Sequence, residues 1–429
     1  MTNVLILTLV FPPDSVSTAT IMGNLAEDLK SQGCQVTVVT TTPHYNRDLE
    51  AERAQPLRNH WGPLLKTSEY RGITVYHVSM PRKGKNIGLR LLSWLGFHFL
   101  STVAGMTVIP RPDVIVTPSP PLTIGLSAWI LAGFYRAPFI YNVQELYPDV
   151  AVSLGALKNR YLIGLLQRLE RFVYAKAARI TTIAPRMRGR ILEKGVPPQK
   201  VELIPNFVDL EDMPPAPKDN AFSRRYGVHD KFLVSYAGNM GVPQGLDKFV
   251  DAAAILRDES GIHFMLLGNG SEKDALEQRA AGYGLANLQI LPYQPYSLMP
   301  DIYGASDVCL VAQAAETGCD AVPSKVYRIM ACGRPVLAVT DLTSDLAALV
   351  TGVRCGAAIQ AGRAEALAEA IAAAYRNQDA WRAMGERGRQ HVVQNYTRPA
   401  VTGQYYRLIQ NLHDRADQSG RAARVGSHG

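Results

Sequence analysis

The chain has 429 residues, of which 47% are hydrophobic and 19% are charged, and its formal net charge is +8 with a pI near 9.2. This length exceeds one ordinary hydrophobic core, so two domains of about 200 residues each are expected, and the composition is that of a globular protein. The positive charge suits an anionic partner, whether nucleic acid, acidic lipid or a phosphorylated substrate, and does not choose among them.

The cysteines argue against a disulfide-rich or zinc-binding protein, and the N-terminal residues argue against a signal peptide. The cysteines are odd in number and show no C-x-x-C spacing, so neither a disulfide framework nor a zinc site is predicted, and a reducing compartment is expected. They are Cys34, Cys309, Cys319, Cys332 and Cys355. The first residues lack the basic region and small-residue cleavage site of a signal peptide, so 4–9 is interpreted as a buried strand.

In the first half of the chain, predicted strands and helices alternate as in a parallel α/β domain. Strands are predicted at 4–9, 36–41, 73–78, 113–117, 139–143, 180–183 and 201–204, with residues 43–70 irregular. The loops 11–18 and 144–149 follow strands, and parallel sheets place ligands there. No G-x-G-x-x-G follows the first strand, which argues against a dinucleotide site, and the alternative for loop 11–18 is a plain connection.

A basic and apolar segment interrupts this domain. Residues 71–112 contain no acid, and residues 91–109 are uncharged and rich in Leu, Trp and Phe, but Ser, Thr, Gly and His dilute the apolar run. The interpretation is a buried or interfacial helix, in its sharper form one that rests on anionic lipid through residues 82–109, and a true span is the weaker alternative.

In the second half of the chain, the same alternation of predicted strands and helices follows a Pro-rich stretch. Residues 206–228 are predicted to be a linker, followed by strands at 232–237, 263–267, 288–291, 308–312 and 336–339. Small loops at Gly238 and Gly268 follow the first two of these strands. A terminal helix is expected at 396–412 and a disordered tail at 413–429.

The stretch 316–335 predicts a phosphate site. A turn at Val322-Pro-Ser324 precedes two helical turns from Lys325 to Cys332, which end at Gly333. A helix start with a lysine favours a diphosphate, because free N–H groups and the ammonium both carry positive charge. The alternative is an ordinary loop-to-helix junction with an exposed lysine.

These motifs together resemble the retaining GT-B glycosyltransferases of family 4, especially the branch related to the colanic-acid and O-antigen transferases. The resemblance covers nearly the whole chain and rests on Phe11-Pro-Pro-Asp14, Gln144-Glu-Leu-Tyr-Pro148, Pro205-Asn-Phe-Val-Asp209, Ala237-Gly-Asn-Met-Gly241, Leu267-Gly-Asn-Gly270 and Val322-Pro-Ser-Lys-Val-Tyr327. It implies two doubly wound, Rossmann-like parallel-sheet domains facing a central cleft. Residues 1–205 would then be the acceptor domain, 229–395 the nucleotide-sugar domain, and 396–412 the helix crossing back to the first domain.

The resemblance also implies roles for particular residues. Charge stabilisation of the departing diphosphate would be the main catalytic device. The implied catalytic residues are Lys325, Asp320 and Glu145. The implied donor-binding residues are Gly238, Asn239, Gly241, Gln244, Gly268, Gly270, Ser324 and Arg328. The implied acceptor-binding residues are Asp14, Ser17, Gln144 and Tyr147. No D-x-D occurs in the chain, which fits the metal-independent habit of this fold, so neither a metal nor another cofactor is expected.

Several positions depart from the pattern of family 4. Asn239 and Gln244 stand where many members have Arg and Lys, and Gln144 stands where many have an acceptor-side His. The E-x7-E motif becomes Asp320 and Arg328, and an all-donor guanidinium cannot accept ribose hydroxyls. Arg328 would instead contact a phosphate or pair with an acid such as Glu316. General-base chemistry would come from Glu145, or would not be needed in a front-face retaining mechanism.

The resemblance therefore implies a metal-independent hexosyltransferase that moves a sugar from a nucleotide sugar to a membrane-associated, lipid-linked glycan in surface or extracellular polysaccharide synthesis. The enzyme would be cytoplasmic and peripheral at the inner face of the plasma membrane. The alternatives are a catalytically weakened homologue that binds sugar nucleotide or scaffolds a polysaccharide assembly complex, and, with less support, a GT-B epimerase or phosphorylase. Nucleic-acid binding is disfavoured because the basic residues are not interleaved with aromatics in a recognisable module.

Overall fold

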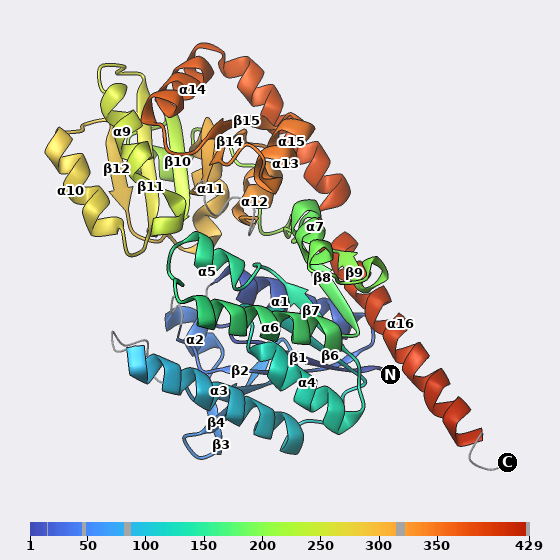
Figure 1. The fold of residues 1–429 in the computed structure, drawn as a ribbon. Coiled ribbons are helices and arrows are strands. Elements are labelled where there is room, and N and C mark those ends of the chain that lie inside the picture. Colours follow the sequence, from blue (N-terminus) through green and yellow to red (C-terminus); the bar gives the residue numbers. More distant parts are fainter. Residues whose placement is uncertain (15, 45–48, 81–86, 315–321, 426–429) are drawn as a thin grey trace. The chain divides into compact units, whose positions relative to one another are not determined.

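A computed structural model describes residues 1–429 except 15, 45–48, 81–86, 315–321 and 426–429 (Figure 1). The chain divides into two compact units. The first comprises Met1–Asn206 and Pro399–Gly429, and the second comprises Phe207–Arg398. Each unit holds its own sheet, so the two are described separately.

The first unit is built on a sheet of nine strands within the described residues, in the order β3-β4-β5-β2-β1-β6-β7-β8-β9. Seven strands from β5 to β9 run parallel, and β3 and β4 form an antiparallel edge. The strands are β1 (Asn3–Leu7), β2 (Gln35–Thr41), β3 (Arg58–Trp61), β4 (Leu65–Tyr70), β5 (Ile73–Val78), β6 (Val114–Ser119), β7 (Phe139–Val143), β8 (Arg179–Thr182) and β9 (Val201–Leu203). The central strands β1, β6 and β7 are almost entirely buried, as apolar runs in a parallel sheet must be.

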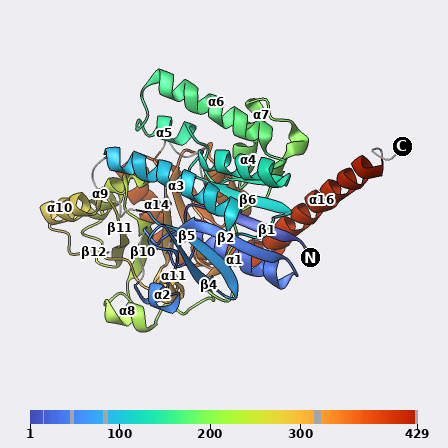
Figure 2. The same ribbon diagram turned by 90° about the horizontal axis from the view of Figure 1, so that it is seen from below.

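Helices cover both faces of this sheet. They are α1 (Ser17–Ser31), α2 (Leu49–Ala54), α3 (Ile87–Thr107), α4 (Ile124–Tyr135), α5 (Asp149–Ser153), α6 (Arg160–Lys176), α7 (Pro185–Glu193), the 3-10 turn η1 (Pro198–Lys200) and α16 (Arg398–Val425). Figure 2 shows α3, α4 and α6 on one face of the sheet and α1 on the other. The first unit is therefore doubly wound, as the sequence predicts.

Two predictions for the first unit are wrong. Residues 43–70 are not irregular throughout, because they contain α2 and the β3–β4 hairpin, whose strand β3 is exposed along its length and gives no hydrophobic alternation. The tail predicted to be disordered from residue 413 continues as helix α16 to Val425. Its sequence is polar but rich in Ala and Arg, which favour helix once a helix has been nucleated.

The second unit has six parallel strands among its described residues, in the order β12-β11-β10-β13-β14-β15. They are β10 (Phe232–Asn239), β11 (Ile262–Asn269), β12 (Leu288–Leu291), β13 (Val308–Ala312), β14 (Val336–Thr340) and β15 (Gly356–Gln360). Five of them match predicted strands. The sixth, β15, was missed because its sequence Gly-Ala-Ala-Ile-Gln offers little bulk to bury.

The helices of the second unit follow its strands. They are α8 (Ala221–Arg225), η2 (Val242–Gln244), α9 (Asp247–Ile255), α10 (Lys273–Tyr283), η3 (Tyr296–Leu298), α11 (Met299–Ala305), α12 (Lys325–Ala331), α13 (Asp345–Val353), α14 (Ala364–Arg376) and α15 (Gln378–Asn395). The predicted linker 206–228 is largely part of this unit, because Phe222 and Val228 are buried in an apolar cluster with Ile302 and Lys218 pairs with Asp307. The Pro-rich composition predicted a linker between domains, whereas most of this segment packs within the second unit.

Helix α16 is anchored to the first unit by a buried polar contact. The hydroxyl of Tyr405 lies 2.8 Å from Asn142 Nδ2 on β7 and 3.4 Å from Thr181 Oγ1 on β8. Thr402 adds a 2.8 Å hydrogen bond to Asp28 on α1. Because unpaired buried polar groups are costly, these contacts fix where the helix docks.

Replacing Tyr405 with Phe is expected to lower the free energy of unfolding by about 1 to 2 kcal/mol, since Asn142 loses a buried acceptor. Urea denaturation followed by circular dichroism measures the change. The neighbouring Tyr406→Phe is the matched control, because the described residues include no hydrogen bond from the half-buried Tyr406 hydroxyl. Equal stability of the two variants would contradict the anchoring role.

Candidate functional site

Two glycine loops end the first two strands of the second unit. Strands β10 and β11 pair in register to their ends, so Gly238 lies beside Gly268 and Asn239 beside Asn269. Both glycines have left-handed backbones, with φ of +147° and +152°. A Cβ on Gly268 would lie 1.8 Å from Gly238 O, and a Cβ on Gly270 would lie 2.2 Å from Met240 O. The loops can approach each other only as bare backbone.

Lys325 places its ammonium group against this backbone. Its Nζ lies 3.8 Å from the centroid of the Tyr236 ring, and a Cβ built on Gly238 would lie 2.5 Å from the same atom. Burial, together with the nearby positive charge of Arg328, lowers the pKa of Lys325 to about 7. The site thus holds a cation that an anionic ligand would stabilise.

Helix α12 carries Lys325 as its first residue, and it ends at the predicted place. Cys332 is the C-cap and Gly333 follows with φ of +69°. Ser324 occupies the N-cap position, but its side chain makes no cap hydrogen bond to the helix in the described structure. The helix is only seven residues long, so the lysine charge rather than the helix end is the main electrostatic feature.

Arg328 lies one turn after Lys325 and adds a second cation. Its guanidinium carbon is 5.5 Å from the centroid of the Tyr296 ring. Asp320 and Glu316, the carboxylates considered for this region, lie outside the described residues. The ring of Tyr296 is partly exposed, so an aromatic surface and two cations lie along one face of α12.

Gln244 closes the Gly238 loop instead of projecting from it. Its side-chain oxygen accepts a hydrogen bond from the Gly241 N–H at 3.0 Å and from Asn239 Nδ2 at 3.3 Å. Tyr236 donates to the carbonyl of Asn239 at 2.6 Å. The amide side chains of Asn239 and Gln244 therefore stabilise the conformation of the loop.

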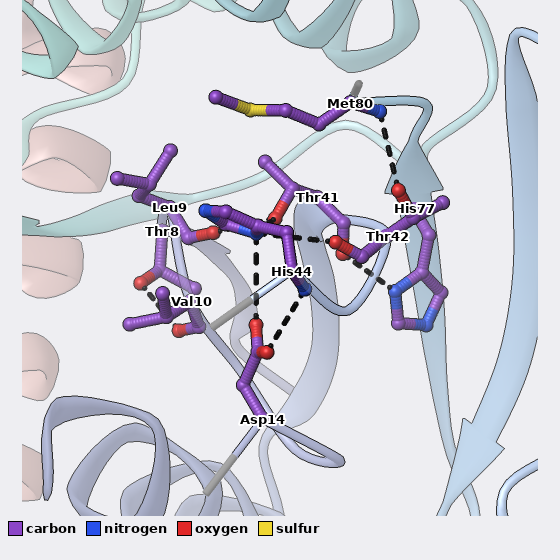
Figure 3. Close-up of polar contacts among 9 residues, drawn as sticks. All are labelled: Thr8, Leu9, Val10, Asp14, Thr41, Thr42, His44, His77 and Met80. Carbon is purple, nitrogen blue, oxygen red and sulfur yellow. Dashed lines mark hydrogen bonds and ion pairs between the residues drawn. The ribbon is translucent and has the colours of Figure 1, made fainter. Parts of the chain in front are cut away.

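In the first unit, Asp14 and His44 meet at the carboxyl ends of β1 and β2 (Figure 3). Asp14 Oδ1 accepts the backbone N–H of His44 at 3.1 Å, and Oδ2 lies 3.9 Å from His44 Nδ1. The two side chains are nearly buried, at 1% and 8% exposed. His44 was not predicted, although its position just after a strand was a usable signal.

The neighbours of His44 determine its tautomer. Nδ1 lies 2.9 Å from Thr41 Oγ1 and 3.2 Å from the carbonyl of Thr42. The Thr41 hydroxyl donates to Leu9 O at 2.8 Å, so it accepts from the ring. Because these neighbours and Asp14 Oδ2 are all acceptors, Nδ1 carries the proton and Nε2 carries the lone pair of the neutral ring. Nε2 points away from Asp14 in Figure 3.

A second histidine, His77, stabilises the strand end that carries His44. His77 on β5 contacts the carbonyl of Thr41 through Nδ1 at 2.9 Å and Ser68 Oγ through Nε2 at 2.7 Å. Burial lowers its pKa to about 4, so the ring is neutral at pH 7. Met80 donates its backbone N–H to Thr42 Oγ1 at 3.1 Å. The end of β2 is thereby held in place around His44.

Gln144 belongs to a buried chain of amides. It donates to Asn142 Oδ1 at 2.7 Å and accepts from Asn206 Nδ2 at 2.8 Å, and Asn142 continues to Tyr405. Both polar atoms of the Gln144 side chain are therefore used inside the protein. Its predicted acceptor contact remains a prediction, and the geometry gives it a structural role as well.

Three other predicted acceptor-side residues lie at the same edge of the sheet. Ser17 begins α1, and Glu145 and Tyr147 follow β7. Tyr147 is half-buried, and its pKa is raised by burial and by the charge of Glu145. Across the described part of the chain no group of His, Cys, Asp and Glu could hold a metal ion.

Comparisons with known proteins identify a family for each part of the chain. Residues 18–206 match the family described as Glycosyl transferase 4-like domain, and residues 219–391 match Glycosyl transferases group 1. The putative colanic acid biosynthesis glycosyl transferase WcaI of Escherichia coli K12 is 26% identical over 79% of this chain and 83% of its own. The probable glycosyltransferase WbjE of Pseudomonas aeruginosa is 27% identical over 64% of this chain and 69% of its own.

Solved structures share the fold at low sequence identity. The structure of Anabaena HepE in complex with UDP superposes with a TM-score of 0.72, 14% identity, and coverage of 96% of this chain and 100% of HepE. The two matched families together occupy most of both units. The chain therefore belongs to the GT-B glycosyltransferases of family 4 type, in the branch that resembles colanic-acid and O-antigen transferases.

Proposed function

We propose that the protein moves a sugar, with retention, from a nucleotide-sugar donor to a membrane-associated, lipid-linked glycan acceptor in surface or extracellular polysaccharide synthesis. The observation that carries the donor part is the Lys325 ammonium against the bare backbone of Gly238. A diphosphate fits there because it is anionic and its oxygens accept from backbone N–H groups.

The donor site supplies charge stabilisation. When the bond from the anomeric carbon to the departing phosphate oxygen breaks, negative charge grows on the diphosphate, and Lys325 and Arg328 stabilise it. The bond to the acceptor oxygen forms, and in a front-face mechanism the acceptor's hydroxyl proton passes to the departing diphosphate. Gly241, Gly268, Gly270 and Ser324 frame the donor, and Asp320 would hold the transferred sugar. No metal is required, since cationic side chains occupy the role.

The comparisons support this assignment by their names. WcaI is named for colanic acid biosynthesis, and HepE was solved with UDP bound. The name of WcaI supports a role in polysaccharide synthesis, and the UDP bound to HepE supports a nucleotide-sugar donor. UDP is therefore the first nucleotide to test.

The acceptor is proposed to bind the first unit. Asp14, Ser17, Glu145 and Tyr147 lie at the carboxyl edge of its sheet, and His44 joins them with a lone pair on Nε2. Membrane contact is proposed through residues 82–109 at the inner face of the plasma membrane. Of these, 82–86 lie outside the described residues. No helix among the described residues is both long and apolar enough to cross a bilayer.

A second candidate is a weakened homologue that binds sugar nucleotide or scaffolds an assembly complex. Two observations favour it: Arg328 replaces a carboxylate, and Gln144 is tied into a buried amide chain. Turnover of the nucleotide sugar distinguishes the two functions. Release of nucleoside diphosphate with any sugar donor supports the transferase, and nucleotide binding without release supports the homologue.

Lys325→Ala is expected to reduce release of nucleoside diphosphate at least about 100-fold, the usual loss on removing a group that stabilises transition-state charge. The assay uses purified protein, membrane extract and a panel of nucleotide sugars. Lys231→Ala is the matched control, because Lys231 lies at the opposite end of β10 and bonds Ser260 O. Unchanged release in Lys325→Ala would refute the site.

Nucleotide affinity is expected to fall as the pH rises above about 7. The anion favours the charged ammonium, so binding takes up a proton once Lys325 is neutral in the free protein. The loss is up to tenfold per pH unit until the pKa of the bound state is reached. Calorimetric titration with UDP, GDP and ADP between pH 7 and 9 measures it, where a terminal phosphate with a pKa of about 6 is already ionised.

Lys325→Met supplies the control for this profile, because it keeps the apolar stem and removes the titrating group. The variant should bind weakly with no pH dependence across this range. The same slope in both proteins would assign the titration to another group.

His44→Ala is expected to lower transfer to the acceptors of a membrane extract at least about tenfold, since one acceptor-side hydrogen bond is lost. Nucleotide affinity should stay the same, because His44 belongs to the other unit. His60→Ala, at an exposed histidine on β3, is the control. A drop in nucleotide affinity with unchanged acceptor transfer would contradict the assignment.

A further inference from the structure

We propose that α3, α4 and α6 form one surface that rests on an anionic phospholipid bilayer. This surface, called the three-helix face, extends well beyond the segment 82–109. The proposal deepens the proposed function by naming the partner of the first unit, and it rests on that function only for the reason a membrane is needed. Its evidence comes from packing, exposure and charge.

The three helices are packed into one layer. His98 on α3 contacts Thr123 Oγ1, just before α4, through Nε2 at 2.7 Å, and a Cβ on Gly105 would lie 2.7 Å from Leu131 on α4. Trp129 on α4 packs edge-on against Phe172 on α6, with ring centroids 5.0 Å apart. The helices lie side by side on the same face of the sheet in Figures 1 and 2.

This layer exposes an unusual amount of apolar surface. The most exposed of the large hydrophobic side chains described on these helices are Tyr161 at 79%, Phe99 at 69% and Leu95 at 67%. Among the side chains of the three helices whose exposure is described, which leaves out 87–93, nine large hydrophobic ones are exposed: Trp94, Leu95, Phe99, Trp129, Ile130, Phe134, Tyr161, Leu162 and Leu165. Scattered apolar residues need no explanation, but a set on three adjoining helices marks an interaction surface.

The charges around the three-helix face have one sign. Glu170 is the only acidic residue in the sequences of the three helices, and its side chain is 1% exposed and bonded to Lys194 at 2.6 and 2.8 Å. The exposed charged residues in or beside α4 and α6 are Arg136, Lys158, Arg160, Arg168, Arg171 and Lys176. Such a surface complements anionic headgroups.

The chemistry favours a bilayer over a protein partner. Trp and Tyr side chains are typical of membrane interfaces, where the ring sits at headgroup level, and Lys and Arg bind anionic lipid around an apolar patch. Lys176 already lies over the ring of Phe172, 5.8 Å from its centroid. Because no described helix is suited to cross a bilayer, the three-helix face is expected to lie on the membrane surface.

The test is flotation of the full chain with vesicles of phosphatidylcholine alone and with added phosphatidylglycerol. Binding is expected only with the anionic lipid, and it should weaken as salt is raised. Leu165→Glu with Phe134→Glu, and separately Arg168→Glu with Arg171→Glu, should each reduce binding at least about tenfold. Leu342→Glu with Val393→Glu, two exposed apolar residues of the second unit, should not.

Tryptophan fluorescence places the contact. Brominated lipid should quench Trp94 and Trp129, so the double variant Trp94→Phe with Trp129→Phe should lose the quenching while Trp61 and Trp381 remain. Binding to neither vesicle, or equal binding by all variants, would overturn the proposal, as would loss of a dimer in Leu165→Glu without loss of lipid binding. Nucleotide binding measured on the same variants shows whether they are folded and keeps a failure here distinct from a failure of the transferase assignment.

Discussion

The proposed donor site depends on the contact between the Lys325 ammonium and the backbone of Gly238. That contact exists because β10 and β11 stay in register to their ends and because the glycines at the ends carry no side chain. Burying an ammonium beside Arg328 costs free energy, and the lowered pKa of Lys325 is the expression of that cost. An anionic ligand would remove this cost, which is why the loop is proposed to bind a diphosphate.

The proposed acceptor site is stabilised differently, by hydrogen bonds between neutral groups and one carboxylate. Asp14 fixes the backbone of His44, Thr41 and Thr42 fix its ring, and His77 fixes the end of β2. Such a network determines the tautomer without any bound ligand. The same logic holds at Gln144, where the buried amide chain reaches Tyr405 on the last helix and links the end of the chain to the edge of the sheet.

Sequence reasoning predicted what is local and missed what depends on distant contacts. The buried strands and the glycine loops were readable because an apolar run or a glycine has a direct local cause. Strand β3 was missed because all of its residues are exposed, and β15 because Gly356 has no side chain and lies against Val336 O. His44 was missed because its importance comes from Asp14, 30 residues earlier. Gln244 was read as a donor contact, and its bonds to Gly241 and Asn239 appear only in three dimensions.

Helix α3 shows how the residues that weakened one interpretation strengthen another. Ser101 and Gly105 dilute the apolar run and argue against a membrane span, yet both are buried, and Gly105 lets Leu131 of α4 approach. Burial keeps His98 neutral, with a pKa of about 4, and it contacts Thr123. Ser101 and Gly105 are thus buried, as is Phe97, while the apolar side chains of Leu95 and Phe99 are exposed, where an ordinary surface helix carries polar groups. Exposure of such apolar side chains to water is unfavourable, whereas contact with a lipid surface would bury them.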